Sequence, residues 1–240
     1  MLEIHQISIL KDNYVYVIHN NKSDETAVVD PGRADPVLHF LQEKGWGCDY
    51  IINTHHHWDH TDGNAEIKAK TGAKIIGFAN DSHRIPEIDI KIQEGEELEI
   101  CGSKAKILFL PGHTLGHIGY YFAKEKALFS GDVIFAMGCG RLFEGSAEQA
   151  YGSLQKIAKL PLDTKIYCAH EYSLDNAEFA LTLNNDNRDL QYRYENVKKL
   201  REKNKPTIPT NIAIELKTNP FLRAENVDEF ARVRKIKDNF

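Results

Sequence analysis

A short run rich in histidine is the feature that most constrains how this chain can fold. It reads Thr-His-His-His-Trp-Asp-His and directly follows Tyr50–Asn53, a segment with the composition of a buried strand. Alternate side chains of an extended chain share a face, so His55 and His57 are expected to project together. Asp59 and His60 lie on the turn beyond and can reach a neighbouring point. The fold must therefore gather these four side chains at one end of a strand.

The chemistry of this run points to metal binding. Imidazole nitrogen and carboxylate oxygen are suitable ligands for zinc and iron-like divalent ions. Four such groups within six positions exceed what one tetrahedral ion would take from one loop while keeping an open position, which favours two ions side by side. His56 and His117 are expected to orient ligands rather than to bind metal. The remaining isolated histidines are expected on the surface: His5, His19, His39 and His83.

Further metal-type residues follow three other predicted strands. They are His113 in Leu-Pro-Gly-His-Thr, Asp132 in Phe-Ser-Gly-Asp, and His170 in Tyr-Cys-Ala-His-Glu. Gly112 and Gly131 suit sharp backbone turns that would bring two of these side chains inward. Strand-end loops often assemble the sites of layered α/β proteins. The pattern predicts a dinuclear site of seven ligands.

Composition sets the class of protein. The 240 residues are 42% hydrophobic and 27% charged, as in ordinary globular domains, and suggest one large domain with a small appendage. The net charge of −5 argues against a protein that binds nucleic acid over its whole surface, and leaves a local basic patch open. We expect neither a signal peptide nor a membrane span. The four cysteines are scattered, which favours buried thiols and a cytoplasmic location.

Strands and helices alternate along the first two-thirds of the chain, which predicts an α/β fold of sheets covered by helices. The expected strands are Tyr14–Ile18, Ala27–Asp30, Tyr50–Asn53, Ala73–Phe78, Lys104–Leu110, Gly119–Phe122, Ala127–Ser130 and Lys165–Cys168. The expected helices are Ala34–Lys44, Gly63–Thr71, Ala147–Leu160, Ser173–Leu183, Asp189–Lys203 and Val227–Lys237, with Ser173 and Asp189 as N-caps. No convincing strand follows Tyr172. We therefore predict domains at 1–172 and 173–240, the second helical.

The ligand pattern resembles the metallo-β-lactamase superfamily, and within it the chain is similar to the glyoxalase II, or hydroxyacylglutathione hydrolase, family. The resemblance runs the whole length of the chain. Beyond the seven candidate ligands, it includes Asp12-Asn13-Tyr14, Asp30-Pro31-Gly32, Gly138-Cys139-Gly140-Arg141, His170-Glu171-Tyr172 and Thr218-Asn219-Pro220-Phe221. It implies an αββα sandwich followed by a helical domain that binds glutathione.

The resemblance also implies roles for the ligands. His55, His57 and His113 would hold one ion, and Asp59, His60 and His170 the other, with Asp132 bridging them. The ions would be zinc, with iron or manganese as alternatives. The implied reaction, the second step of methylglyoxal detoxification, hydrolyses S-D-lactoylglutathione to D-lactate and glutathione. A bridging hydroxide would attack the thioester, with Asp59 and Asp132 as catalytic ligands and no Ser or Cys nucleophile.

Family matching places five residues around the glutathione moiety, whose carboxylates need basic partners: Arg141, Phe143, Tyr172, Arg234 and Lys237. Two of them depart from the eukaryotic pattern, which has Lys and Tyr where this chain has Arg141 and Phe143. Arginine keeps the charge with different geometry, and phenylalanine cannot donate a phenolic hydrogen bond. The departures bear on the affinity for glutathione more than on the chemistry. The family inclines us to a monomer.

Three other readings remain open. A persulfide dioxygenase on the same fold would use one iron held by two histidines and an aspartate, and the full ligand set weighs against it. A phosphodiesterase or RNA-processing nuclease would want an extended basic surface. A binding protein with a structural zinc ion would be expected to have a closed site of four ligands, often cysteines.

Overall fold

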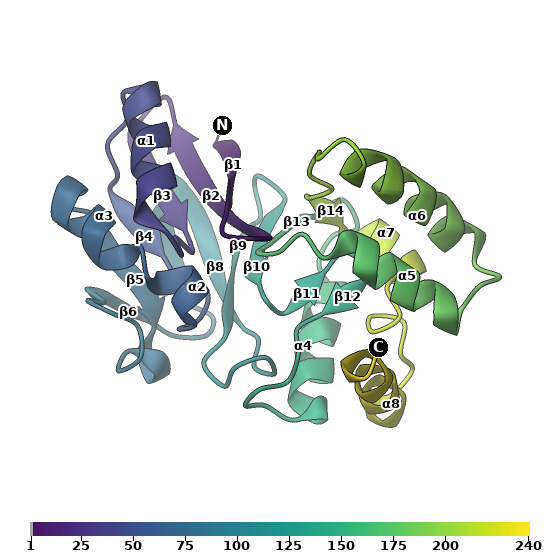
Figure 1. Cartoon of the computed structure of the whole chain (residues 1–240). Helices are drawn as coiled ribbons and strands as arrows, with labels where there is room; N and C mark the ends of the chain where they lie inside the picture. Colours follow the sequence, from purple (N-terminus) through teal and green to yellow (C-terminus); the bar gives the residue numbers. More distant parts are fainter. Residues whose placement is uncertain (1) are drawn as a thin grey trace. The chain divides into compact units, whose positions relative to one another are not determined.

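The structure is a computed structural model that describes residues 2–240 and falls into two units. The first unit runs to Phe109 and resumes for Gly116–Gly131, whereas the second comprises Leu110–Leu115 and Asp132–Phe240. Figure 1 follows the chain through its elements. Each unit is built around its own buried side chains.

A mixed sheet dominates the first unit. Its strands follow chain order: β1 (Glu3–Ile9), β2 (Asn13–Asn20), β3 (Glu25–Val29), β4 (Tyr50–Ile52), β5 (Lys74–Phe78) and β6 (Ile90–Ile92). β1, β2 and β3 pair antiparallel through tight turns, and β3 to β6 pair parallel. Parallel neighbours need long crossovers, which here contain α1 (Ala34–Lys44), the one-turn α2 (Trp58–Thr61), α3 (Asn64–Thr71) and the 3₁₀ turn η1 (Ala79–Asp81).

Helices α1 and α3 cover one face of this sheet with a wholly apolar contact. Val37 and Leu41 of α1 and Ile67 of α3 join Val17 and Ile51 of the strands in one buried cluster. α1 ends at Gly45, whose φ of 69° closes the helix in the left-handed conformation. The sequence predicted this stop, and it lets the chain turn back towards β4.

Four antiparallel strands face the other side of the sheet within the first unit. They are β7 (Glu97–Ile100), β8 (Ser103–Phe109), β9 (Ile118–Phe122) and β10 (Ala127–Gly131). Tyr16 of β2 packs on Phe129 of β10 with ring centroids 5.5 Å apart. The buried Tyr120 hydroxyl donates to the Asn53 carbonyl at 3.0 Å. These contacts fix the strand end from which the histidine run departs.

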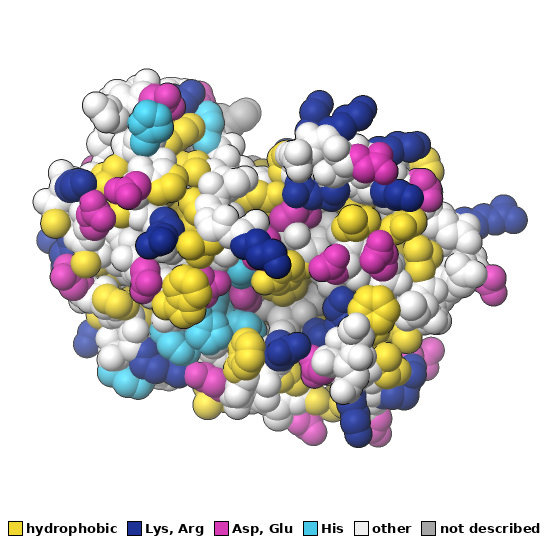
Figure 2. All heavy atoms as spheres, viewed as in Figure 1, with side chains coloured by type: hydrophobic (Ala, Val, Ile, Leu, Met, Phe, Trp, Pro, Cys, Tyr) yellow, Lys and Arg dark blue, Asp and Glu magenta, His cyan; other side chains and the backbone are white. Residues whose placement is uncertain are grey.

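The second unit is mainly helical. It contains the hairpin of β11 (Ile134–Phe135) and β12 (Gly138–Cys139), α4 (Ala147–Ala158), β13 (Lys165–Cys168), α5 (Ser173–Leu183), α6 (Arg188–Arg201), β14 (Thr210–Asn211), α7 (Ile212–Thr218) and α8 (Val227–Asp238). β13 and β14 pair antiparallel. Its core includes the rings of Phe179, Phe221 and Phe230. Lys and Arg side chains gather over α6 (Figure 2).

Every strand that the sequence predicted overlaps an observed strand, and α1 and α5 have the predicted bounds. Three local predictions were wrong. The N-cap of α5 is Tyr172, not Ser173 as predicted. The N-cap of α6 is Asn187, not Asp189, and the Asn187 side chain accepts a hydrogen bond from the Leu190 N–H. β14 is a strand beyond Tyr172, although it is only two residues long and is defined by its pairing with β13.

His19 is also not on the surface. It is 1% exposed, and its ring stacks on Trp46 with centroids 3.8 Å apart and an interplanar angle of 6°. Its Nδ1 atom lies 2.9 Å from the Thr26 hydroxyl. An isolated histidine in a strand carries no sequence signal for such a partner across the sheet, so the expectation failed there.

The predicted domain boundary at residue 172 stays a prediction. The two compact units of the structure are divided instead near residues 109 and 131. Among the described residues, none of the helices combines the length and hydrophobicity required to cross a bilayer.

Candidate metal centre

A buried carboxylate at the end of β3 organises the histidine loop. Asp30 accepts hydrogen bonds from the Thr54 backbone N–H at 2.8 Å and from the Thr54 hydroxyl at 2.6 Å. Its Oδ2 atom also lies 3.3 Å from Nδ1 of His60. Asp30 is 3% exposed and has a φ of 51°, a costly conformation that its surroundings enforce. A carboxylate that orients one imidazole nitrogen leaves the other available to a metal.

The four predicted donors of the first unit lie together. Nε2 of His55 is 3.1 Å from Nδ1 of His57, and Nε2 of His60 is 3.4 Å from Oδ2 of Asp59. Asn13 donates to the Asp59 carboxylate at 2.9 Å and orients it. His55 and His60 are buried, whereas the Asp59 side chain is 20% exposed. The one-turn helix α2 presents Asp59 and His60 in the place where the sequence predicted a turn.

The other two histidines of this region surround these donors. His56 is turned away, as alternation predicted, and its Nδ1 atom lies 3.1 Å from Oδ2 of the buried Asp81. The His117 ring stacks on His55 with centroids 4.6 Å apart. A Cβ atom at Gly131 would lie 2.8 Å from this ring, and the φ of Gly131 is 49°. The glycine therefore allows the chain to turn beside His117.

In the second unit, two predicted donors, His113 and His170, lie beside the carboxylate of the third, Asp132. Oδ2 of Asp132 lies 3.4 Å from Nε2 of His113 and 3.3 Å from Nε2 of His170. All three residues are at most 6% exposed. His113 donates from Nδ1 to the Arg141 carbonyl at 2.7 Å, which directs Nε2 towards Asp132. The His170 ring stacks on Tyr172 at 4.7 Å and 5°.

The spacing of donor atoms within each unit fits a divalent ion. Ligands about 2.1 Å from a tetrahedral ion lie about 3.4 Å from each other. The separations of 3.1 to 3.4 Å in the two donor sets match this value. In the first unit, ligand atoms of Asp30, His55 and His60 all lie within 4.8 Å of one another. The buried His and Asp groups are therefore suited to divalent metal ions.

The predicted substrate residues differ in exposure. Arg141 and Phe143 are largely exposed, and Nε of Arg141 lies 3.5 Å from Oδ1 of Asp238. Arg234 is 7% exposed, and its guanidinium donates to the Cys139 carbonyl at 2.9 Å and to Asp238 at 3.0 Å. An arginine fixed in this way supports the backbone beside it.

Lys237 is only partly buried. Its ammonium group lies 5.0 Å from the Phe179 ring and 4.9 Å from the Phe240 ring, and donates to the Asp175 carbonyl at 3.3 Å. Burial lowers the pKa of Lys237 below its ordinary value, although Asp175 acts in the opposite direction.

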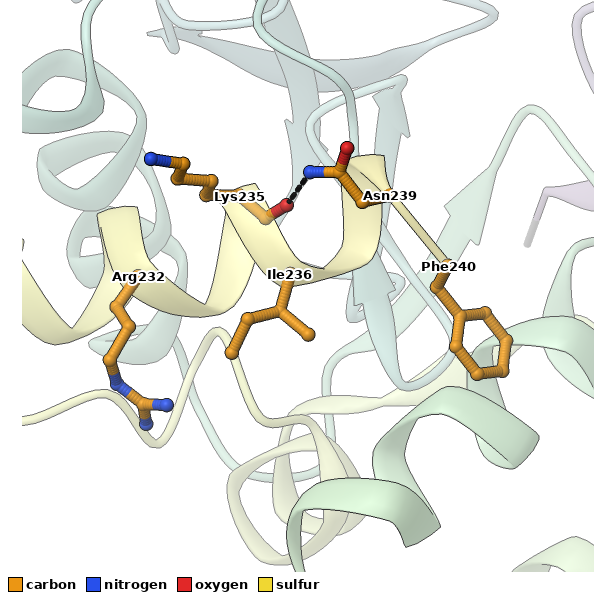
Figure 3. A pocket seen from close by; sticks show the side chains of 5 residues that line it. All are labelled: Arg232, Lys235, Ile236, Asn239 and Phe240. Atoms are coloured by element: carbon orange, nitrogen blue, oxygen red, sulfur yellow. Dashed lines mark hydrogen bonds between the residues drawn. The ribbon is translucent and has the colours of Figure 1, made fainter.

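The basic residues of α8 are divided between faces of the helix. Arg232 and Lys235 line a shallow groove with Ile236, Asn239 and Phe240 (Figure 3), whereas Arg234 is buried and does not line it. Asn239 donates to the Lys235 carbonyl there at 2.7 Å. The basic residues that are close together in the sequence of α8 therefore have different environments: Arg232 and Lys235 line the groove, and Arg234 is buried.

The cysteines are buried, as predicted. Burial raises the pKa of the Cys139 thiol to about 11, although Arg234 acts against it. A thiol of this kind is not a nucleophile at neutral pH.

Comparison with known proteins decides the family. Residues 10–170 match the model of the metallo-β-lactamase superfamily, and residues 171–240 match that of the hydroxyacylglutathione hydrolase C-terminus. A hydroxyacylglutathione hydrolase of Methylococcus capsulatus is 48% identical, with 100% of this chain and 99% of that protein covered. The chain belongs to the hydroxyacylglutathione hydrolase family.

Further similarities agree with this membership in the hydroxyacylglutathione hydrolase family. A hydroxyacylglutathione hydrolase of Pelagibacter ubique is 45% identical over the full length of both chains, at 100% coverage of each. Among solved structures, ETHE1 from Myxococcus xanthus is 22% identical, has a TM-score of 0.75, and is matched over 97% of this chain and 90% of that one. A metallo-β-lactamase from Staphylococcus aureus is 22% identical with a TM-score of 0.70, over 99% of this chain and 71% of that one. These distant structures show the metallo-β-lactamase sandwich fold alone.

Sequence reasoning missed several supporting residues of this hydroxyacylglutathione hydrolase. Asp30 and Asn13 were noted only as parts of family motifs, although Asp30 ends a strand as Asp132 does, and that position could have identified it. Asp81 and Glu215 were not predicted, because the contacts that link them to this region, with His56 and with the Met137 N–H, join segments far apart in the sequence.

Proposed function

We propose that this protein converts S-D-lactoylglutathione and water to D-lactate and glutathione, the second step of methylglyoxal detoxification. The observation that carries the proposal is the similarity to enzymes of that name over the whole chain, C-terminal region included. The ligand chemistry supports it, since paired metal ions serve hydrolysis and the buried cysteines are poor nucleophiles. The persulfide dioxygenase alternative is less well supported than this assignment.

The proposed centre holds two ions, which we assign as zinc, with iron or manganese as alternatives. His55, His57 and His113 would hold the first ion, Asp59, His60 and His170 would hold the second, and Asp132 would contribute to both. Bound ions supply a water of lowered pKa, about 7 for zinc, and polarise the thioester carbonyl. The spacing of the donor atoms within each unit supports this assignment.

The protein's own groups hold these donors in place. Asp30 orients His60, and Asn13 orients Asp59. The Arg141 carbonyl fixes the protonated nitrogen of His113, so that Nε2 is the donor to the metal. Such pre-organisation removes the cost of arranging ligands during the reaction.

The glutathione moiety is proposed to lie against Arg141, Phe143, Tyr172, Arg234 and Lys237. Lys237 supplies a charge for a substrate carboxylate from a partly apolar setting, which strengthens the attraction. Arg234 supplies charge from a buried position and fixes the Cys139 backbone. A monomeric state and a cytoplasmic location belong to the same proposal.

The test is to purify the protein, measure its metal content, and follow the loss of thioester absorbance with S-D-lactoylglutathione. We expect about two ions per chain and rapid hydrolysis that a chelator abolishes and zinc, iron or manganese restores. Two bound ions without hydrolysis would overturn the substrate assignment. Oxygen uptake with glutathione persulfide would instead identify the dioxygenase.

A further inference from the structure

The hairpin formed by β11 and β12, together with the residues that flank it, contacts all three predicted metal donors of the second unit. It begins at Ile134, two residues after Asp132, and a Cβ atom at Gly140, the residue that follows β12, would lie 2.0 Å from the Asp132 carbonyl oxygen. Beyond it, the Arg141 carbonyl accepts the hydrogen bond from His113. The Phe135 ring meets the His170 ring edge-on at 5.8 Å. The conformation of this hairpin therefore sets the relative positions of the three donors.

The hairpin has few internal interactions to stabilise it. Each of its strands has two residues, and Met137 at its turn has a φ of 57°. Hairpins of this size are unstable alone, and a left-handed methionine is a strained conformation. Its buried backbone groups also need hydrogen-bond partners from elsewhere.

Side chains from the C-terminal helices supply those partners. Asn219, the C-cap residue of α7, donates to the Phe135 carbonyl at 3.2 Å and to the Gly138 carbonyl at 2.9 Å. Glu215 of α7 accepts from the Met137 N–H at 2.9 Å. The Ala136 and Cys139 carbonyls accept from Asn176 of α5 at 3.2 Å and Arg234 of α8 at 2.9 Å. Every residue from 135 to 139 is thus bonded through its backbone by a helix side chain.

Glu215 and Asn219 are themselves rigidly held. Both are fully buried, and Asn219 donates to the Glu215 carboxylate at 3.0 Å. Arg193 of α6 pairs with the other oxygen of Glu215 and donates to the Thr210 hydroxyl at 2.8 Å. A buried carboxylate with all its partners present has one geometry, and losing one partner is costly.

We propose that Glu215 and Asn219 are positioning residues for the metal centre, acting through the hairpin on His113, Asp132 and His170. The C-terminal region then builds the metal site in addition to contacting substrate. The inference rests on the metal ligands assigned under the proposed function and is independent of which thioester is hydrolysed.

The test compares zinc affinity in Asn219→Ala and Glu215→Gln with that of the unaltered chain, by competition with a chromophoric chelator. Supporting residues around metal ligands typically contribute 10- to 100-fold in affinity, and we expect a loss of about tenfold or more in both variants. Asn176→Ala removes one hydrogen bond to the same hairpin and should give a smaller loss. The Asn176→Ala variant still tests the proposal if Asn219→Ala or Glu215→Gln does not fold.

Val197→Ala is the matched control, because it removes buried apolar volume from α6 and leaves the hydrogen bonds to the hairpin intact. We expect it to lower the melting temperature of the metal-free protein while zinc affinity stays at the original value. Unchanged zinc affinity in Asn219→Ala and Asn176→Ala would overturn the positioning role. An original chain that binds zinc tightly without cleaving the thioester would overturn the substrate proposal alone, and one that binds no zinc would overturn both.

Discussion

Asp132 lies between the two other predicted metal donors of the second unit. Its Oδ2 atom faces an imidazole nitrogen of His113 and one of His170, at 3.4 and 3.3 Å. Individual ligands of this kind could be predicted from the sequence, because each follows a strand and a glycine-rich turn or a polar segment. The group that orients His113 could not, since the Arg141 carbonyl reaches it from a distant part of the chain. The error on His19 has the same origin.

Replacement of Asp132 tests the ligand assignment. Asp132→Ala should abolish hydrolysis and lower the metal content, because the proposed bridge contributes to both ions. Metal analysis after dialysis and a thioester assay give the two readouts. Asp186→Ala, at an exposed position between α5 and α6, is the control and should change neither. Full activity with both metals retained in Asp132→Ala would refute the bridging role.

Lys237 offers a test of substrate binding. Lys237→Ala should raise KM roughly 5- to 30-fold at little change in kcat, because a charged hydrogen bond contributes about 1–2 kcal/mol equally to ground and transition states. Steady-state kinetics measure this, and Lys235→Ala on the groove face of α8 is the control. A large fall in kcat at constant KM would contradict the assignment.

The same residue predicts a pH dependence. Because burial lowers the pKa of Lys237, its ammonium group loses its proton at a lower pH than an ordinary lysine does. KM should therefore be low below that pKa and rise as the pH increases through it. In Lys237→Arg the charge persists, so the rise should disappear from the alkaline limb. An identical alkaline rise in both proteins would assign it to another group.

At the level of elements, prediction succeeded where a helix carries its own boundary signals and failed where pairing defines the element. α1 ends at the glycine that the sequence marked, and α5 has the predicted bounds. α7 is seven residues long, too short for a convincing periodic pattern, and was not predicted. Yet Glu215 lies on α7 and Asn219 is its C-cap, so the element with the weakest sequence signal contacts the hairpin that follows Asp132.

Acid stability tests one link between elements. The Asp89 carboxylate before β6 accepts from the Ile75 N–H of β5 at 2.9 Å and from Lys68 of α3 at 3.0 Å. The Ile75 hydrogen bond, with help from Lys68, lowers the pKa of Asp89. This stabilisation is complete above the pKa of the unfolded chain, about 4, and is lost as the pH falls through the folded value.

Asp89→Asn should therefore be about 1 kcal/mol less stable at pH 7, and the difference should shrink as the pH falls below about 4. Urea unfolding at a series of pH values measures this difference. Asp35→Asn, in the first turn of α1, is the control for loss of a carboxylate near a helix. A gap between Asp89→Asn and the unaltered chain that stays constant down to pH 2.5 would rule out the titration of Asp89 as its cause.

For the whole molecule, the alternation of strands and helices predicted the α/β class, whereas the seven-residue ligand set stays a prediction. The compact division of the chain was not predicted. Residues 110–115 join the second unit because its loops bond them: Gly145 donates to the Gly112 carbonyl at 3.0 Å and Ser153 to the Pro111 carbonyl at 2.7 Å. No local sequence pattern predicts such contacts between distant segments.

This division gives the last prediction, because the proposed ligands come from both units. Four belong to the first unit and three to the second, so ions bound by all seven would make the unfolding of the two units cooperative. Zinc at 100 times its dissociation constant adds about 2.7 kcal/mol, which corresponds to roughly 5–11 °C in Tm for a chain of this size. Calorimetry should show one sharp transition with zinc and a lower, broader or double transition after chelation.

The Asp132→Ala protein provides the internal comparison for this prediction. With the proposed bridge removed, zinc should no longer raise Tm by that amount or merge the transitions, although the metal-free profile should stay close to that of the unaltered chain. Equal zinc-dependent shifts in the two proteins would mean that the ions bind within one unit only. The metal would then stabilise that unit, and the catalytic centre would have to be sought among the donors of that unit alone.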